Sequence, residues 1–588
     1  MPTDSVPLNE GESGRPSVLL RRLPPEHLAL ALLLTGLLIL HVVAIFTENI
    51  NWDEFALLSR AADTIRTGQM HSGGRPGLGT LILIPFVDGC SDSIAAIRSA
   101  RLLWVGFTVA LVWGFWSLLA RGLESVGRSN RSAALGIALL VLVPAFLRFS
   151  IQVRTDQPAI ALGLWGGVAL LASRQRSPWA LLAGVLFGTG FLFSQKAAYV
   201  AALAGLLVVG DLFLRRELRV DRELARAGLC LLGGIAVLEA FRALLPAFVE
   251  PVAVQSVSTG LGAFGFYRAD FGYAFYVRML PTLIPHLVLL ALTLIATGRP
   301  LRNEGGQWRL LLIAWAILAL GTVVGLFHAG AFPYFWMTLG LFPAAAAATA
   351  LEPIRHLYPR KRHRRVVLGF IWIFLAAQSA IAAAVLLKDS QRGQRESLAF
   401  IERNFARDQE GFHPERALFC RDAKDPFPVM FSQTIAAHYW GPEREVNGSR
   451  LIGEFRERPV AFLLDSFRLR QFPPEIQEFW VSGYRPYYES VLIPAVQLRG
   501  RPGEEDSVSI LVPGKYRLRH DGEAGNPYLR LDGTSLLARD TIELVAGSYR
   551  IEYLREVDRA ELLFAVTDPP KPAAHPFYKR MTDLGFGW

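Results

Sequence analysis

The sequence predicts a polytopic α-helical membrane protein with a soluble C-terminal region, as its composition and charge distribution both indicate. Of the 588 residues, 52% are hydrophobic, and the mean hydropathy of +0.31 is too high for an ordinary soluble protein. Residues 1–388 carry a net charge of +13, whereas residues 389–588 carry −3. The basic excess therefore belongs to the membrane half, where it follows the positive-inside rule and does not indicate nucleic-acid binding.

The membrane half contains about eleven apolar segments that approach the length needed to cross a bilayer. They lie at 27–47, 96–120, 132–150, 157–173, 178–194, 197–214, 226–246, 274–297, 309–327, 333–351 and 366–387. Three, five, three and six Lys or Arg residues occupy the linkers 121–131, 215–226, 299–309 and 355–365. We therefore expect a cytoplasmic tail at 1–26, a transmembrane domain at 27–388 and a periplasmic C-terminal region, in the plasma membrane of a bacterium.

The first long outer loop, 48–95, is expected to contain a short helix over 54–67. Asn51 or Asp53 can cap its start, and Gly68 can end it. The spacing of its apolar residues suits a helix that lies in the membrane interface. The second outer loop, 247–273, is rich in glycine and aromatic residues.

Three cysteines do not make a disulfide framework. The topology places Cys90 and Cys420 on the outer side, where a bridge between them is one alternative. We expect two separate buried thiols instead.

After residue 388 the composition becomes that of a soluble region. Residues 389–500 are expected to form a small α/β region, with strands at 416–421, 459–465 and 489–496 and a helix at Pro474–Gly483. Residues 501–588 are expected to form a β-sandwich-like domain. Its predicted strands are 508–512, 515–520, 528–531, 541–545 and 549–553, and turn residues separate them.

Two pairs of charged residues lie just outside the spans on the outer side. Asp53 and Glu54 follow the first span, and Arg154 and Asp156 precede the fourth. Helix capping accounts for each acidic residue taken alone. An arginine at that edge, where positive charge is scarce, is well suited to bind a phosphate or diphosphate. Because both pairs lie on the same side of the membrane, we expect a polar or anionic substrate there.

Further candidates follow in the other outer turns. Lys196 could contact a phosphate, or its side chain could extend to the membrane interface. The sequence favours neither alternative. Tyr267 and Arg268 belong to the aromatic loop, where Arg268 is a phosphate candidate. His328 and Tyr334 bound a short turn, and His328 fits a structural role better than a catalytic one.

Trp52-Asp53-Glu54, Arg75-Pro76-Gly77, Arg154-x-Asp156-x-Pro158, Lys196 and Phe332-Pro333-Tyr334 together resemble the GT-C superfamily of membrane glycosyltransferases. The resemblance covers about residues 27–390 and is to the branch of protein O-mannosyltransferases and aminoarabinose transferases. It differs at Pro333-Tyr334-Phe335-Trp336, where relatives often carry Arg-Tyr. The β-rich tail after residue 500 is not general to that family either.

The resemblance implies an inverting enzyme that moves a sugar from a polyprenyl-phosphate donor to an envelope acceptor. Asp53 would be catalytic with Glu54 assisting, and Asp156 would be the second acidic position. The phosphate would be held by basic residues of the outer loops, which implies Arg154, Lys196 and Arg268. Further substrate-binding residues would be Arg75, Tyr267, His328 and Tyr334. No nucleotide-binding or zinc-ligand spacing appears. Because the inner linkers are too short to form a soluble domain for a nucleotide sugar, a sugar donor would reach the outer face attached to lipid.

Several alternatives stay open at this point. A transporter or flippase of lipid-linked sugars would require polar residues at mid-membrane and internal repeats, and the sequence shows few of the former and none of the latter. A non-catalytic scaffold that binds glycan is the third reading. The acceptor could be lipid, protein or polysaccharide. Asp53, Glu54 and Asp156 could share a divalent cation or act without one.

Overall fold

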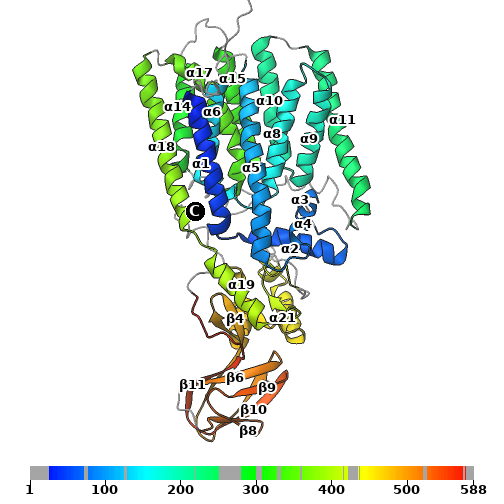
Figure 1. The fold of residues 1–588 in the computed structure, drawn as a ribbon, viewed down its shortest axis with the longest axis vertical. Helices are drawn as coiled ribbons and strands as arrows, with labels where there is room; N and C mark the ends of the chain where they lie inside the picture. The colour runs from blue at the N-terminus through cyan, green and yellow to red at the C-terminus, as the bar shows by residue number, and fades with distance from the viewer. Residues whose placement is uncertain are drawn as a thin grey trace, which may run out of the picture.

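The computed structural model describes residues 25–71, 77–124, 129–216, 219–249, 280–298, 307–327, 333–357, 360–414, 416–421, 435, 438–520, 526–573 and 577. Four candidates from the sequence lie outside these residues: Arg75, Tyr267, Arg268 and His328. The described part is an elongated molecule, in which a bundle of long helices stands on a smaller soluble region (Figure 1).

In each predicted span, the described residues form one helix or several short helices. These are α1 (Pro25–Thr47), α5 (Ser93–Gly122), α6 (Ser129–Val141), α7 (Pro144–Phe149), α8 (Asp156–Ala172), α9 (Pro178–Phe193), α10 (Ala197–Arg215), α11 (Val220–Leu244), α14 (Ile284–Gly298), α15 (Gln307–Phe327), α17 (Leu341–Leu357) and α18 (Lys361–Lys388). The chain is thus a multi-pass membrane protein.

The count of about eleven spans is not confirmed. Within the described ranges, seven helices are long and apolar enough to cross a membrane, or eight if a bent pair is one span. Helices α6, α8 and α9 are apolar but have only 13, 17 and 16 residues. The predicted span 132–150 breaks because Pro144 starts a new helix after Val143, whose backbone is extended.

The helix predicted over 54–67 is confirmed as α2 (Trp52–Thr67). Asn51 caps it in a capping box with Glu54, and Gly68 ends it with a φ of 68°. The chain bends by 73° between α1 and α2, so α2 lies across the end of the bundle that faces the soluble region (Figure 1). Two short helices, α3 (Leu78–Leu81) and α4 (Ile84–Val87), complete the described part of this loop.

The soluble region combines helices with two sheets. Its main helices are α19 (Arg392–Asn404), α21 (Arg444–Glu457) and α22 (Pro474–Gly483). The larger sheet has the order β1-β2-β4-β11-β6-β9, with β3 also on β4, and the smaller has the order β5-β10-β7-β8. The strands are β1 (Gly411–Phe412), β2 (Phe462–Leu464), β3 (Tyr484–Tyr488), β4 (Val491–Gly500), β5 (Glu505–Ile510), β6 (Gly514–His520), β7 (Leu529–Leu531), β8 (Thr534–Leu536), β9 (Thr541–Leu544), β10 (Gly547–Tyr553) and β11 (Val557–Phe564).

Strand β4 joins the two predicted parts of this region. Its first residues pair with β2, and its later residues pair with β11, so one sheet continues across residue 500. The prediction of a strand at 416–421 is wrong, because those residues form turns. Arg421 donates its backbone N–H to the carbonyl of Leu418, which closes one of these turns instead of extending a ladder.

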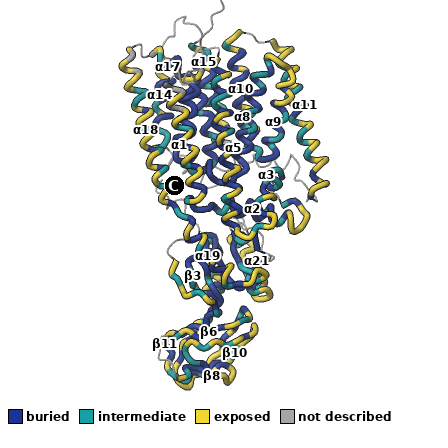
Figure 2. Tube along the Cα trace, viewed as in Figure 1, coloured by how far each residue is buried: buried dark blue, intermediate teal, exposed yellow. Residues whose placement is uncertain are grey.

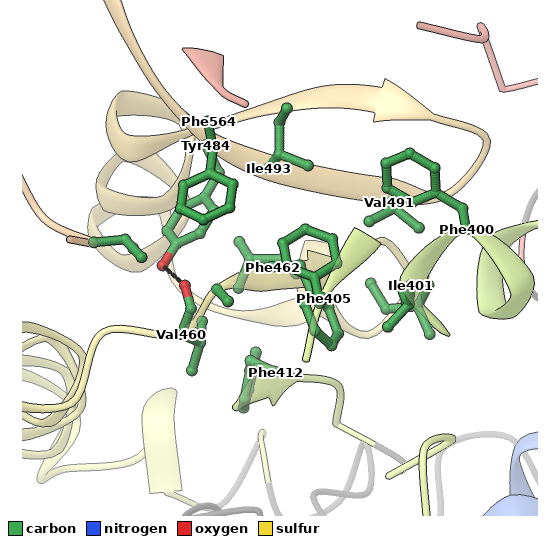
Figure 3. Packing of buried hydrophobic residues seen from close by; sticks show 14 of the residues in the cluster. Phe400, Ile401, Phe405, Phe412, Val460, Phe462, Tyr484, Val491, Ile493 and Phe564 are labelled. Atoms are coloured by element: carbon green, nitrogen blue, oxygen red, sulfur yellow. Dashed lines mark hydrogen bonds between the residues drawn. The ribbon is translucent and has the colours of Figure 1, made fainter. Parts of the chain in front are cut away.

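One cluster of buried residues extends from the end of the bundle that carries α2 into the soluble region (Figure 2). In the soluble core, Phe405 packs near Phe400 of α19 and near Phe462, with ring centroids 6.2 and 4.8 Å apart, and Tyr484 donates its hydroxyl to the carbonyl of Val460 at 2.7 Å (Figure 3). Because α2 and α19 contribute to the same hydrophobic core, the soluble region and the loop before α5 are held together by packing.

The expectation of two separate outer thiols is wrong. Cys90, just before α5, and Cys420 form a disulfide with a Cα–Cα distance of 5.3 Å. The Arg66 guanidinium of α2 donates to the carbonyls of Phe419 and Arg421, on either side of Cys420. Cys230 is a free cysteine. The fold brings the two outer cysteines into bonding range from 330 residues apart in sequence.

Candidate functional site

Asp53 and Arg154 form an ion pair at the end of the bundle that faces the soluble region. Asp53 lies in the first turn of α2, and Arg154 lies in the segment 150–155 between α7 and α8. The Arg154 Nη2 atom is 2.8 Å from the Asp53 Oδ2 atom. The side chain of Asp53 is 23% exposed and that of Arg154 is 6% exposed. The carboxylate is therefore the partner that a substrate reaches more readily.

A second ion pair joins Lys196 to Asp156. The Lys196 Nζ atom is 2.7 Å from the Asp156 Oδ2 atom, and the Ser194 hydroxyl donates to Asp156 Oδ1 at 3.2 Å. Lys196 stands in the tight turn between α9 and α10, and Asp156 starts α8. The turn and the helix start thus hold a cation and a carboxylate side by side.

The ring of Tyr334 links the two pairs. Tyr334 belongs to the single 3-10 turn η4 (Pro333–Phe335). The Arg154 guanidinium carbon lies 3.5 Å from the centroid of its ring, and Lys196 Nζ lies 4.8 Å from it. Both distances are in the range of cation–π contacts. The structure therefore brings together five residues that the sequence selected: Asp53, Asp156, Arg154, Lys196 and Tyr334.

Glu54 is placed differently from its neighbour Asp53. It is completely buried, and its two oxygens accept hydrogen bonds from Nε and Nη2 of Arg101 at 2.8 and 2.6 Å. The same oxygens accept the backbone N–H groups of Asn51 and Val153. Glu54 thus fixes α2 against α5 and against the segment that carries Arg154. Both oxygens of Glu54 are therefore engaged within the protein.

Sequence reasoning missed a set of buried polar residues beneath the site. Glu48 accepts a hydrogen bond from Gln152 Nε2 at 3.1 Å and lies 3.7 Å from Arg148 Nε. Burial raises the pKa of Glu48 to about 7, although Arg101 and Arg148 act to lower it. The signal for this set was present, because Arg101 and Arg148 are charged residues inside the predicted apolar spans 96–120 and 132–150.

The soluble region holds the loop that leads into α2. The side-chain amide of Gln394, from α19, donates to the Ile50 carbonyl and accepts the Ile50 N–H, both at 2.9 Å. The Asp389 carboxylate accepts the backbone N–H of Asn49 at 3.0 Å, and the Asn49 side chain donates to the Phe577 carbonyl at 3.4 Å. The loop before Asp53 is therefore fixed from outside the membrane domain.

An apolar cavity of about 330 Å³ opens beside the site. Helices α14, α15 and α17 line it together with the short α16 (Trp336–Leu339). Its lining includes Trp336, two residues after Tyr334, as well as Leu290 and Phe342. An apolar chain could thus lie in the bundle with its polar end near Tyr334.

The described residues do not assemble the three-carboxylate cation site that the sequence left open. Among them, no group of three or more His, Cys, Asp or Glu side chains could hold a metal ion. Asp53, Glu54 and Asp156 instead face Arg154, Arg101 and Lys196, respectively.

No family model matches the sequence, and no curated protein matches it. The structure is similar to that of ArnT from Cupriavidus metallidurans bound to undecaprenyl phosphate, with a TM-score of 0.51 and 11% identity over 79% of this chain and 97% of that chain. ArnT in the apo state matches with a TM-score of 0.50 and 12% identity, over 80% of this chain and 98% of that chain. Arabinosyltransferase EmbB from Mycobacterium smegmatis matches with a TM-score of 0.40 and 13% identity, over 95% of this chain and 66% of that chain. The likeness to ArnT shows that the two chains share a fold.

Proposed function

We propose that this protein is an inverting glycosyltransferase that moves a sugar from a polyprenyl-phosphate donor to an envelope acceptor. The observation that carries the proposal is the cluster of Asp53, Arg154, Tyr334, Lys196 and Asp156 at one end of an apolar bundle. The similar ArnT structure was determined with undecaprenyl phosphate. We further propose that this end of the bundle faces the periplasm, as the distribution of basic linkers predicts.

Arg154 and Lys196 would bind the phosphate of the donor. As the bond between the anomeric carbon and the phosphate oxygen breaks, the phosphate gains negative charge, which two preorganised cations stabilise. Arg154 can offer two parallel N–H groups to the phosphate, and Lys196 offers a compact charge. Asp156 keeps Lys196 in place through the 2.7 Å contact.

Asp53 would be the general base. It would take the proton from the acceptor hydroxyl or amine while that atom bonds to the anomeric carbon on the side opposite to the phosphate. Before the donor binds, the Oδ2 atom of Asp53 is engaged by Arg154 at 2.8 Å. A bound phosphate would draw Arg154 toward itself and would leave this oxygen to the acceptor.

The apolar cavity beside Trp336 would take part of the polyprenyl chain. Its lining is largely aliphatic and aromatic, and an apolar chain gains free energy by leaving water for such a site. A lipid acceptor, a protein acceptor and a polysaccharide acceptor all fit a base at this position.

The test is an assay of the purified protein with a pool of polyprenyl-phosphate sugars and a membrane extract as acceptor. Wild type should release polyprenyl phosphate and form a glycosylated product, and Asp53→Asn should lower turnover by about 10²–10⁴-fold. Asp63→Asn is the matched control. Asp63 is also on α2 and also pairs with arginines, but its partners are Arg66 of α2 and Arg416 of the soluble region. Donor binding without turnover by wild type would contradict the proposal and favour a transporter or a scaffold.

A further inference from the structure

We propose that Glu48 is a positioning residue that orients Arg154 for the donor phosphate through the side-chain amide of Gln152. The inference rests on the proposed function, and it deepens it by assigning a residue that touches neither substrate. Glu48 directly follows α1, and both Glu48 and Gln152 are completely buried.

A continuous chain of hydrogen bonds leads from Glu48 to the site. Gln152 donates its Nε2 to Glu48 at 3.1 Å, and its Oε1 accepts from Arg154 Nη1 at 3.4 Å. Arg154 Nη2 in turn contacts Asp53 at 2.8 Å. One amide thus joins the buried carboxylate to the guanidinium that would bind the phosphate.

The direction of this amide depends on the charge of Glu48. An ionised carboxylate only accepts hydrogen bonds, so it holds the NH₂ end of Gln152 and leaves Oε1 for Arg154. A protonated Glu48, or a neutral side chain at the same position, can itself donate to Oε1 of Gln152. The amide can then turn and present its NH₂ group to Arg154. Arg154 cannot accept that hydrogen bond, so it would lose its orientation.

Glu48 could simply compensate the positive charges of Arg101 and Arg148, but its contacts with them are long. Its Oε2 atom is 4.0 Å from Arg101 Nη2, and Arg148 Nε is 3.7 Å from Oε1. Within the described part of the chain, neither Glu48 Oε2 nor Arg148 Nε has a hydrogen-bond partner. The side-chain hydrogen bond that Glu48 accepts there is the one from Gln152, on the path to Arg154.

Three charged groups act on Glu48: Arg101 on α5, Arg148 on α7 and Glu54 on α2. Asp389, which follows α18, acts on the two arginines. Since burial raises the pKa of Glu48 to about 7, the carboxylate is charged above that pH and neutral below it. The orienting effect should therefore be complete above pH 7 and lost as the pH falls through this value.

The experiment measures binding of polyprenyl phosphate, and KM and kcat for the sugar donor, with the full chain in lipid nanodiscs above and below the pKa of Glu48. Wild-type affinity should rise with pH through about 7. Glu48→Gln, which keeps the shape but cannot titrate, should give a flat profile. Above that pH it should bind about tenfold more weakly, which is the size expected for a weakened hydrogen bond to a charged group. Because Glu48 touches neither reacting atom, kcat should change less than KM.

Asp211→Asn is the matched control. Asp211 is a buried carboxylate that pairs with Arg174 and Arg215 near the other end of α10, 15 residues after Lys196. Its substitution should leave the pH profile of binding unchanged. A Glu48→Gln protein with the wild-type affinity and slope would overturn the inference.

A second variant keeps the inference testable if Glu48→Gln does not fold. Gln152→Leu leaves every charge in place and removes the connection, so it should also weaken binding and lose the pH dependence; wild-type affinity in this variant would overturn the inference. Binding is read separately from transfer. If wild type binds polyprenyl phosphate but transfers no sugar, the proposed function fails while the role of Glu48 in orienting Arg154 is still measured.

Discussion

The guanidinium of Arg154 lies over the ring of Tyr334, 3.5 Å from its centroid. A cation–π contact of this kind contributes about 0.5–2 kcal/mol, and the same ring also faces Lys196. Replacing Tyr334 with leucine should therefore weaken donor binding by about 2- to 30-fold. Tyr334→Phe keeps the ring and should stay closer to wild type. The measurement is KM for the polyprenyl-phosphate sugar; equal values for the two variants would show that the ring does not hold the cations.

Lys196 should contribute to donor affinity through its charge. Lys196→Met keeps much of the side-chain length and removes the ammonium group, so KM for the donor should rise by about 10- to 100-fold. The effect should shrink at high salt, because Lys196 is partly accessible and its attraction to phosphate is screened. Lys388→Met, at the exposed end of α18, is the control and should bind donor as wild type does. A salt-independent loss would indicate a packing defect instead.

The Cys90–Cys420 disulfide should stabilise the junction between the membrane domain and the soluble region. Cys90→Ser should lower the free energy of unfolding by about 2–5 kcal/mol, because the bridge closes a very long loop. Thermal unfolding with and without a reductant checks this. Reductant should lower the Tm of wild type and leave the Tm of Cys90→Ser unchanged. Cys230→Ser removes the free thiol and should keep the wild-type response to reductant.

Helices α9 and α11 pack through glycines, and the contact leaves no room for a side chain. A Cβ at Gly184 would overlap the backbone carbonyl oxygen of Cys230. Gly184→Ala should therefore force the helices apart and destabilise the bundle by about 1–3 kcal/mol. Gly228→Ala, on α11, is the control, since a Cβ there meets no atom within 4 Å. Comparing the Tm values of the two variants in detergent tests the prediction, and equal values would contradict it.

The sequence identified five site residues that the structure brings together, because outer turns and helix starts can be located from hydropathy alone. Asp53, Arg154 and Lys196 all stand within a few residues of a predicted span edge. Glu48 and Gln152 were missed because their roles depend on which helices are neighbours. Hydropathy gives no such information, although Arg101 within an apolar span was a usable signal.

Some elements of the fold were also predicted from the sequence, and others were missed. The helix at Pro474–Gly483 was located correctly, since Pro at the start and Gly at the end mark its limits. Strand β11 was missed because a register shift between Val557 and Ala560 interrupts the alternation that identifies a strand. The Cys90–Cys420 pair could not be derived either, since nothing local connects residues 330 positions apart.

The hydrogen bonds that hold the loop before α2 have a consequence for the order of biosynthesis. Asn49 and Ile50 obtain their partners from Asp389, Gln394 and Phe577, which lie 340, 344 and 528 residues away in sequence. A nascent chain whose helices have already entered the bilayer still lacks these partners. The loop that leads to Asp53 thus reaches its final form only after residue 577 has been synthesised, so a chain that stops before that residue would occupy the membrane without a completed candidate site.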